Sequence, residues 1–122
     1  MSKKVYCIAQ FRARPGREEE LFETLKALEP DTLREDGCLR YVVTRHREHP
    51  CAPGSTEYPI VFNEVWADDD AFAAHCNRRA IREFFERECL DEKGAVEAYN
   101  VCVYTDEGAH YDAPVAGASC EG

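Results

Sequence analysis

The stretch Ile60-Val61-Phe62-Asn63-Glu64-Val65-Trp66, followed one residue later by Asp68-Asp69-Asp70, decides how this chain can fold. Its first seven residues are rich in β-branched and aromatic side chains, which favour a strand. The three aspartates supply a helix cap and an acidic first turn. The chain is therefore expected to pass almost directly from a strand into a helix. Because side chains alternate along a strand, Phe62, Glu64 and Trp66 share one face.

The residues before this stretch predict a strand, a helix and a second strand. Val5 to Phe11 is rich in β-formers and ends before Pro15-Gly16, which indicates a turn. Three glutamates and a stripe of apolar side chains at helical spacing then predict a helix, which Pro30 interrupts because proline lacks a backbone donor. Cys38 to Arg45 predicts the second strand. We expect its alternation to place three side chains on one face: Leu39, Tyr41 and Val43.

The rest of the chain completes a known order of elements. Residues 48–59 hold three prolines and a glycine and predict a loop. Two helical pieces, Asp69 to Cys76 and Arg78 to Glu88, precede a last strand from Ala95 to Tyr104. The order β-α-β-β-α-β predicts an α+β, ferredoxin-like domain over residues 1–104, with a four-stranded antiparallel sheet and helices on one face. We expect the tail, residues 105–122, to be flexible or to contact a partner.

Composition narrows the functional classes. The 122 residues fit one domain, and a net charge of -9 argues against nucleic acid or an anionic membrane as partner. A small neutral or aromatic ligand suits this surface better. The start, Met1-Ser2-Lys3-Lys4, lacks the apolar core of a signal peptide, and no apolar run approaches the roughly 20 residues of a membrane span. Seven cysteines, an odd number, are expected to be reduced thiols in a cytoplasmic protein.

The strands carry apolar residues on both faces. Cys7 and Ile8, Tyr41 and Val42, and Phe62 and Val65 lie at opposite parities of their strands. Helices can cover one face of such a sheet, and the other face then needs a second cover. The pattern therefore predicts a homodimer in which two sheets pack together.

Three segments resemble one family, the antibiotic biosynthesis monooxygenases. They are Phe11 to Leu21, the turn Glu35-Asp36-Gly37-Cys38-Leu39-Arg40-Tyr41, and Phe62 to His75, in which Glu64-x-Trp66 precedes the histidine by a fixed spacing. The resemblance implies a dimeric α+β barrel with a pocket between sheet and helices. It also implies oxygenation without metal, haem or flavin, because the deprotonated substrate itself reduces dioxygen. Other members are isomerases of small sugars or haem-degrading enzymes.

The resemblance points to His75, Glu64 and Trp66 as site residues. His75 titrates near neutrality, and its position in the family, near the pocket mouth, makes it the candidate general base. A buried carboxylate needs a partner, so we expect Glu64 to contact an Arg, His or Tyr and to support the base or act as one. Trp66 is expected to hold an aromatic substrate. Ordinary core packing is the alternative for each of these residues.

Two further residues are candidates for substrate binding. Tyr41 could donate to a substrate oxygen, with sheet packing as the alternative. Phe62 stands where some family members carry an asparagine, four residues before the tryptophan, and would line the pocket instead of helping to activate oxygen. The segment from Arg78 to Glu88 contains no histidine, which argues against haem chemistry.

His46, His49 and Cys51 form a separate cluster of candidate metal ligands before the proline-rich loop. Imidazole and thiolate suit zinc, but this spacing matches no standard finger and a fourth ligand is missing. An ordinary solvated loop is the default interpretation, and no cofactor is predicted.

The sequence thus favours a cofactor-free monooxygenase that oxidises a small phenolic, quinol or polyketide-like compound with dioxygen. His75 would take the proton, Glu64 would support it, and Trp66, Phe62 and Tyr41 would hold the substrate. Two alternatives remain open. One is a non-oxidative isomerase of a small carbonyl compound on the same fold. The other is a non-catalytic dimeric module for ligand binding or metal sensing.

Overall fold

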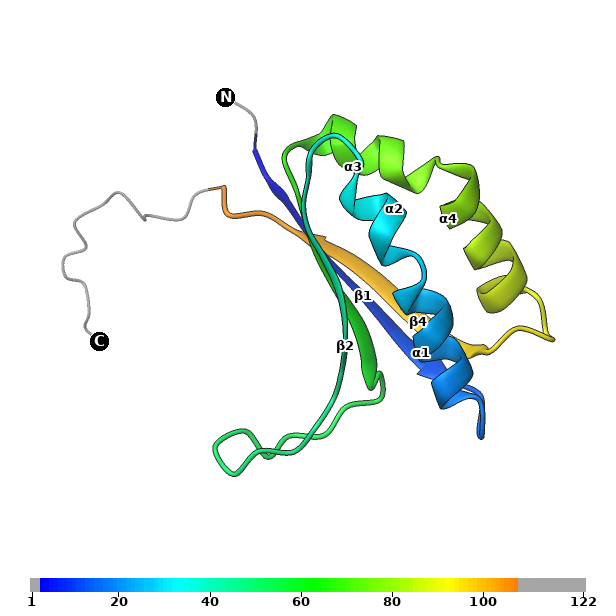
Figure 1. Cartoon of the computed structure of the whole chain (residues 1–122). Helices are drawn as coiled ribbons and strands as arrows, with labels where there is room; N and C mark the ends of the chain where they lie inside the picture. Colours follow the sequence, from blue (N-terminus) through cyan, green and yellow to red (C-terminus); the bar gives the residue numbers. More distant parts are fainter. Residues whose placement is uncertain (1–2, 108–122) are drawn as a thin grey trace.

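The computed structural model describes residues 3–107, and in this range one antiparallel sheet carries four helices on one face (Figure 1). The strands, in the spatial order β2-β3-β1-β4, are β1 (Val5–Ala13), β2 (Cys38–Arg45), β3 (Ile60–Trp66) and β4 (Val96–Tyr104). The helices are α1 (Glu18–Lys26), α2 (Glu29–Leu33), α3 (Asp69–Cys76) and α4 (Arg79–Phe84). This arrangement confirms the predicted ferredoxin-like α+β fold.

The helix that Pro30 was predicted to interrupt is divided as expected. α1 ends at Lys26, and α2 begins at Glu29 with Pro30 in its first turn, where a missing N–H costs no hydrogen bond. The helices described are all short, and none is long and apolar enough to cross a bilayer. The break turns the chain so that α2 packs against β2, the next strand along the chain.

The bounds predicted for β2 are confirmed, but one side chain is misplaced. Tyr41 and Val43 are buried on the helix-facing side, whereas the Leu39 side chain is 54% exposed. The reason is a β-bulge: Cys38 pairs with Trp66 and Arg40 with Val65, so Leu39 has no partner in the ladder. Simple alternation therefore fails at this one position.

α3 begins as predicted, with the Asp68 carboxylate accepting from the Ala71 N–H at 2.8 Å.

The predicted helical piece Arg78 to Glu88 consists of two different helices. The first is α4, which passes at Phe85 into a π-helical segment, η1 (Phe85–Leu90). Wider turns of this kind are commonly associated with functional sites.

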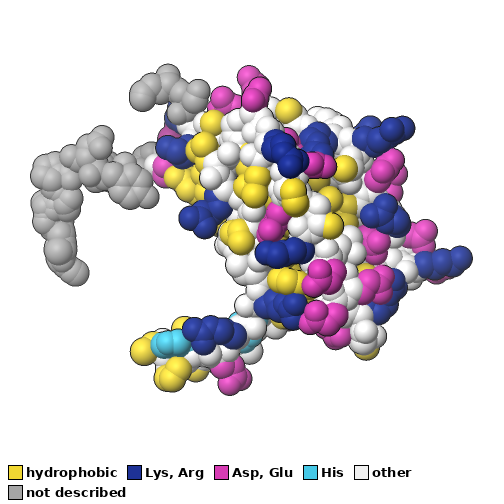
Figure 2. All heavy atoms as spheres, in the orientation of Figure 1, with side chains coloured by type: hydrophobic (Ala, Val, Ile, Leu, Met, Phe, Trp, Pro, Cys, Tyr) yellow, Lys and Arg dark blue, Asp and Glu magenta, His cyan; other side chains and the backbone are white. Residues whose placement is uncertain are grey.

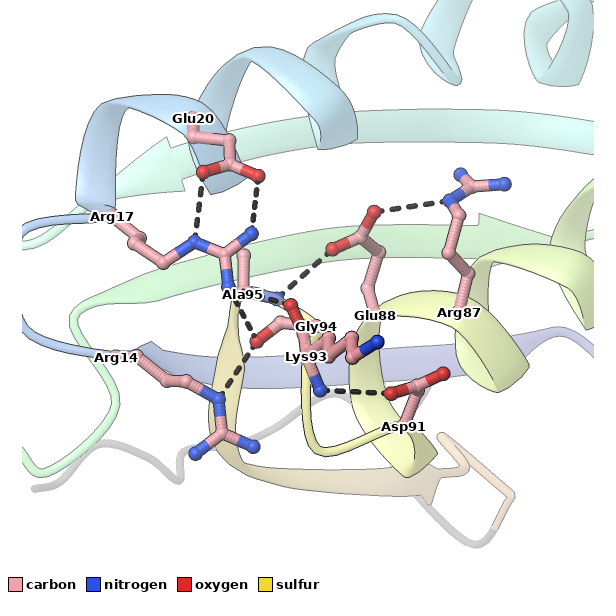
Figure 3. Close-up of polar contacts among 9 residues, drawn as sticks. All are labelled: Arg14, Arg17, Glu20, Arg87, Glu88, Asp91, Lys93, Gly94 and Ala95. Carbon is pink, nitrogen blue, oxygen red and sulfur yellow. Dashed lines mark hydrogen bonds and ion pairs between the residues drawn. The ribbon is translucent and has the colours of Figure 1, made fainter.

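Polar contacts fix the start of β4 against the β1–α1 turn, as Figure 3 shows. The Gly94 carbonyl accepts from Arg14 Nε at 2.7 Å and from Arg17 Nη1 at 2.9 Å. The carboxylate of Glu88, at the end of η1, accepts from the Ala95 N–H at 3.0 Å. These bonds satisfy backbone groups that would otherwise be unpaired at the corner of the sheet.

The two faces of the sheet differ in burial. The core lies between sheet and helices, and its largest fully buried side chains are Trp66, Phe11, Phe62, Phe84, Leu21 and Leu25. On the opposite face, residues such as Ile8, Val65 and Cys102 are only half-buried. The face of the molecule seen in Figure 2 carries a mixture of acidic, basic and scattered apolar side chains.

The loop between β2 and β3 extends away from the body of the molecule (Figures 1 and 2). It comprises residues 46–59, two more than predicted at its start. The His46 N–H donates to the Pro59 carbonyl at 2.7 Å, which closes the base of the loop. The predicted tail begins after β4, and most of it, residues 108–122, lies outside the described range.

Gly37, in the turn before β2, lies against the first turn of α3. It has a φ of 83°, a left-handed conformation, and its carbonyl accepts from the Ala67 N–H at 2.8 Å. A β-carbon added at this position would lie 2.5 Å from the β-carbon of Ala71. Glycine is therefore required here both for the backbone conformation and for the close approach of the turn to α3.

Substituting Gly37→Ala is expected to lower the free energy of unfolding by about 2–4 kcal/mol. Roughly 1–2 kcal/mol comes from the left-handed backbone, and the rest comes from forcing Ala71 away. Gly16→Ala is the matched control, because Gly16 also has a φ of 83° but nothing lies near its added β-carbon. Urea denaturation of both variants measures the difference. Equal losses would show that the turn does not press on α3.

Candidate functional site

A cavity of about 50 Å³ lies between the inner face of the sheet and the helices. Most of its wall is apolar, and all four strands, the helices α1, α3 and α4 and the start of η1 contribute to it. A hollow on the surface shares four lining residues with this cavity, which places the cavity mouth beside β4. Those residues are Cys76, Ile81, Phe85 and Val101. The residues of the cavity wall that carry chemistry are Cys7, Tyr41, Glu64, His75 and Cys76.

Glu64 projects from the middle of β3 into this cavity wall and is 6% exposed. Its carboxylate accepts from the indole Nε1–H of Trp66 at 2.9 Å. The buried carboxylate thus has a partner, as predicted, but this partner is the indole and not one of the residue types named as examples (Arg, His or Tyr), because both side chains share one strand face. Burial raises the pKa of Glu64 to about 7, although hydrogen bonds from Trp66 and Cys7 oppose the shift.

His75 lies in the wall of the cavity, deeper than the expected position near its mouth. His75 is 4% exposed. The centre of its ring lies 4.5 Å from that of Trp66 and 5.3 Å from that of Tyr41. Burial lowers the pKa of His75 below its ordinary value, although a hydrogen bond to Glu35 opposes this shift. The imidazole is consequently neutral at neutral pH and able to accept a proton.

Glu35 is a site residue that the sequence reasoning missed. Its Oε2 atom lies 3.1 Å from His75 Nδ1 and also accepts a hydrogen bond from Arg78 Nη1. The same Arg78 nitrogen lies 3.4 Å from the hydroxyl of the fully buried Thr32. The sequence offered one indication of its role, the position of Glu35 in Glu35-Asp36-Gly37. That segment was interpreted only as a turn, and its carboxylate was not considered.

Tyr41 and Phe62 line the cavity as predicted for substrate-binding residues, and Trp66 does not. The Tyr41 and Phe62 rings stack with centres 4.2 Å apart. Burial raises the pKa of Tyr41, so its hydroxyl stays protonated and can donate. Trp66 is completely buried behind the wall, where it contacts Tyr41, His75 and Glu64. The tryptophan can thus orient the site but does not face the cavity.

The two thiols in the wall are poor nucleophiles. Burial raises the pKa of both Cys7 and Cys76, and the negative charge of Glu64 adds to the effect. Both therefore stay protonated at neutral pH. The six cysteines in the described part of the chain are all free thiols, while Cys120 lies outside that part.

The cluster of His46, His49 and Cys51 does not assemble as a metal site. His46 Nε2 lies 3.0 Å from the Gly54 carbonyl, and His49 Nδ1 accepts from the Cys51 N–H at 3.0 Å. Across residues 3–107, no three His, Cys, Asp or Glu side chains come close enough to hold a metal ion. The two imidazoles instead stabilise the shape of the loop.

The fold and the cavity define a ferredoxin-like protein in which Glu64 and His75 both line one cavity between sheet and helices. Residues 4–87 match the antibiotic biosynthesis monooxygenase family, and the chain belongs to that family. The match contains β1 to β3, the helices α1 to α4 and every cavity residue named above except Val101. The family resemblance predicted from the sequence is confirmed.

Solved structures of similar proteins extend this result. A protein from Shewanella oneidensis is 31% identical, with a TM-score of 0.70 over 86% of this chain and 92% of that one. A Pseudomonas aeruginosa protein is 25% identical, with a TM-score of 0.69 over 86% and 95%. A structure from Deinococcus radiodurans, provisionally named an antibiotic biosynthesis monooxygenase, is 21% identical, with a TM-score of 0.63 over 82% and 89%. A search of curated proteins found no match.

Glu64→Gln is expected to change how stability depends on pH. Because the folded-state pKa of Glu64 is raised from 4.5 to about 7, the folded protein holds this proton more tightly than the unfolded chain does. The wild type therefore loses stability as pH rises through this range, by about 3 kcal/mol from this group. The variant should match the wild type near pH 5 and exceed it by about that amount near pH 8, measured by urea denaturation.

Trp66→Phe provides the control for this measurement. It removes the indole donor that favours the carboxylate, so the pKa of Glu64 should rise further and the pH-dependent loss of stability should grow. Comparing each variant with itself at two pH values cancels the cost of repacking the ring. A pH-independent difference between Glu64→Gln and the wild type would contradict the raised pKa.

Proposed function

We propose that this protein is a cofactor-free monooxygenase that oxidises a small phenolic, quinol or polyketide-like compound with dioxygen. One observation carries the proposal: Glu64, whose pKa is raised to about 7, and His75, whose pKa is lowered below its ordinary value, line the same largely apolar cavity. Membership of the antibiotic biosynthesis monooxygenase family supports it. The stacked rings of Tyr41 and Phe62 offer an aromatic surface against which a substrate ring can lie.

The first step is proton removal from the substrate hydroxyl. His75 is neutral at neutral pH and accepts this proton, which leaves a phenolate or enolate in the cavity. Glu64 is the second group able to accept a proton, because its carboxylate is half-formed near neutrality. The cavity wall is largely apolar, so an anion beside it is less well solvated than in water and is a stronger electron donor.

The anion then supplies all the electrons that dioxygen needs. For a substrate whose keto tautomer carries a CH₂ group, the carbanionic carbon transfers one electron to O₂, and the radical pair joins as a C–O bond. The peroxide takes the proton held by His75. Loss of the remaining C–H proton then breaks the O–O bond, which leaves C=O and releases water. The balance is CH₂ + O₂ → C=O + H₂O, and no external reductant is required.

His75→Gln is expected to lower the turnover of a proven substrate by about 10²–10⁴-fold, the range typical of a lost general base. Glutamine keeps a polar group at this buried position. The free energy of unfolding of the variant should be measured as well, because His75 packs against the rings of Tyr41 and Trp66. Oxygen consumption with a panel of phenols and quinols measures the effect. Phe72→Leu, which alters a neighbouring cavity residue without removing a titratable group, is the matched control. If His75→Gln turned over the substrate at the wild-type rate, the base would be Glu64 and not His75.

The pH profile distinguishes the two bases. If His75 is the base, kcat/KM rises with pH through the pKa of His75, which lies below the ordinary histidine value of about 6.5. If Glu64 is the base, the rise lies at about pH 7. We expect Glu64→Gln to keep the rise at the lower pH.

The same acid–base pair also suits the isomerisation of a small carbonyl compound. Enolisation needs one group to remove a proton and a second to return it, and His75 and Glu64 supply both roles. Exchange of substrate C–H protons with deuterated solvent under anaerobic conditions, without oxygen uptake in air, would favour this second function over the first.

We infer that the protein works as a homodimer. The sheet face away from the helices carries half-buried apolar side chains, including Ile8, Val65 and Cys102, beside the exposed Tyr104. A second sheet packed on this face would remove that surface from water. Sedimentation equilibrium should give twice the chain mass, and Ile8→Asp together with Val65→Asp should give a monomer. A wild-type monomer at micromolar concentration would contradict the inference.

A further inference from the structure

Glu35 reaches His75 from a segment forty positions earlier in the chain. Glu35 lies in the turn between α2 and β2, and its Oε2 atom is 3.1 Å from His75 Nδ1 on α3. The side chains of both residues are largely buried, with 14% and 5% exposure. Glu35 also forms an ion pair with Arg78 through the same oxygen.

We propose that Glu35 is a positioning residue that holds His75 in the form with Nδ1 protonated, so that Nε2 carries the free lone pair. The proposal rests on the proposed function of His75 as the base. An ionised carboxylate can only accept hydrogen bonds, so the nitrogen facing it must donate. Neutral imidazole has a single N–H, and the nitrogen left to take a substrate proton is then Nε2.

The surrounding structure makes this orientation rigid. The turn that carries Glu35 is seated on α3 by the close approach of Gly37 to Ala71, one helical turn before His75. Arg78 lies between α3 and α4 and binds both Glu35 in the turn and Thr32 in α2. It therefore connects α2 and the turn to the junction of α3 and α4. The His75 ring itself lies against Trp66 and Tyr41, which limits its rotation.

The arrangement also explains why burial does not abolish the basicity of His75. Burial lowers the pKa of the imidazole, and the hydrogen bond and negative charge of Glu35 act in the opposite direction. The positive charge of Arg78, which contacts the same Glu35 oxygen as His75, lowers the pKa of His75. Glu35 therefore sets both which nitrogen reacts and how strongly it holds a proton.

The test is ¹⁵N NMR of the histidine side chains at a pH where His75 is neutral, with its signals assigned by their loss in His75→Gln. The wild type should show a protonated Nδ1 and a bare Nε2. Glu35→Ala should shift the ring toward the Nε2–H form, which free histidine favours. Glu35→Gln should retain the wild-type form, because Arg78 keeps an amide oxygen in the accepting position.

Asp36→Ala is the matched control, since it removes a negative charge from the exposed neighbouring position and should leave the spectrum unchanged. A wild-type ring protonated on Nε2, or a Glu35→Ala spectrum identical to the wild type, would overturn the proposal. If Glu35→Ala does not fold, the wild-type spectrum alone still decides.

Kinetics separate this proposal from the proposed function. With a turned-over substrate, Glu35→Ala should lower kcat by about 10²-fold and leave KM nearly unchanged, because the cavity wall that binds substrate remains. Glu35→Gln should recover most of that loss. A change of tautomer in a protein that oxidises no phenol or quinol would support the role of Glu35 and count against the oxygenase.

Discussion

The close contact between the turn at Gly37 and the first turn of α3 is the constraint on which the site depends. It requires a residue without a side chain at position 37 and a small one at position 71. Because the turn cannot retreat from the helix, the carboxylate of Glu35 and the imidazole of His75 meet inside the protein. A backbone requirement at one glycine thus determines the geometry of two chemical groups, Glu35 two positions before Gly37 and His75 four positions after Ala71.

The cavity places ionisable groups in an apolar environment, which is costly unless each is neutral or paired. Glu35 forms an ion pair with Arg78. Among residues 3–107, Glu64 has no cationic partner; it accepts from the Trp66 indole, and burial raises its pKa to about 7. His75 avoids the cost by remaining neutral. The site therefore holds one ion pair, a carboxyl group whose pKa is raised to about 7 and an imidazole whose pKa is lowered by burial.

Much of the fold could be predicted because the local patterns in β2, β3 and α3 are strong. The bounds Cys38–Arg45, Ile60–Trp66 and Asp69–Cys76 agree with the structure, and Asp68 caps its helix as its sequence position indicates. Leu39 was misplaced because a bulge cannot be seen in an alternating pattern. The π-helical turns of η1 could not be predicted either, because the spacing of their apolar side chains is that of an ordinary amphipathic helix.

The site was predictable only where its residues share one element. Glu64 and Phe62 face the same side of β3, and His75 follows at a recognisable spacing, so the sequence could group them. Trp66 shares that face too, yet it lies behind the cavity, because depth within a core depends on the helices packed above it. Glu35 could not be assigned from pattern, since its contact with His75 spans forty positions and depends on tertiary packing.

The carboxyl group of Glu64 also couples ligand binding to the uptake of a proton from the solvent. An anionic ligand in the cavity would disfavour the carboxylate and raise its affinity for a proton, so binding near neutrality would draw a fraction of a proton from solution. The heat of binding measured by calorimetry would then vary with the ionisation enthalpy of the buffer. A neutral ligand of the same shape would lack this dependence, so the exchange of protons with the buffer reports the charge state of whatever the cavity receives.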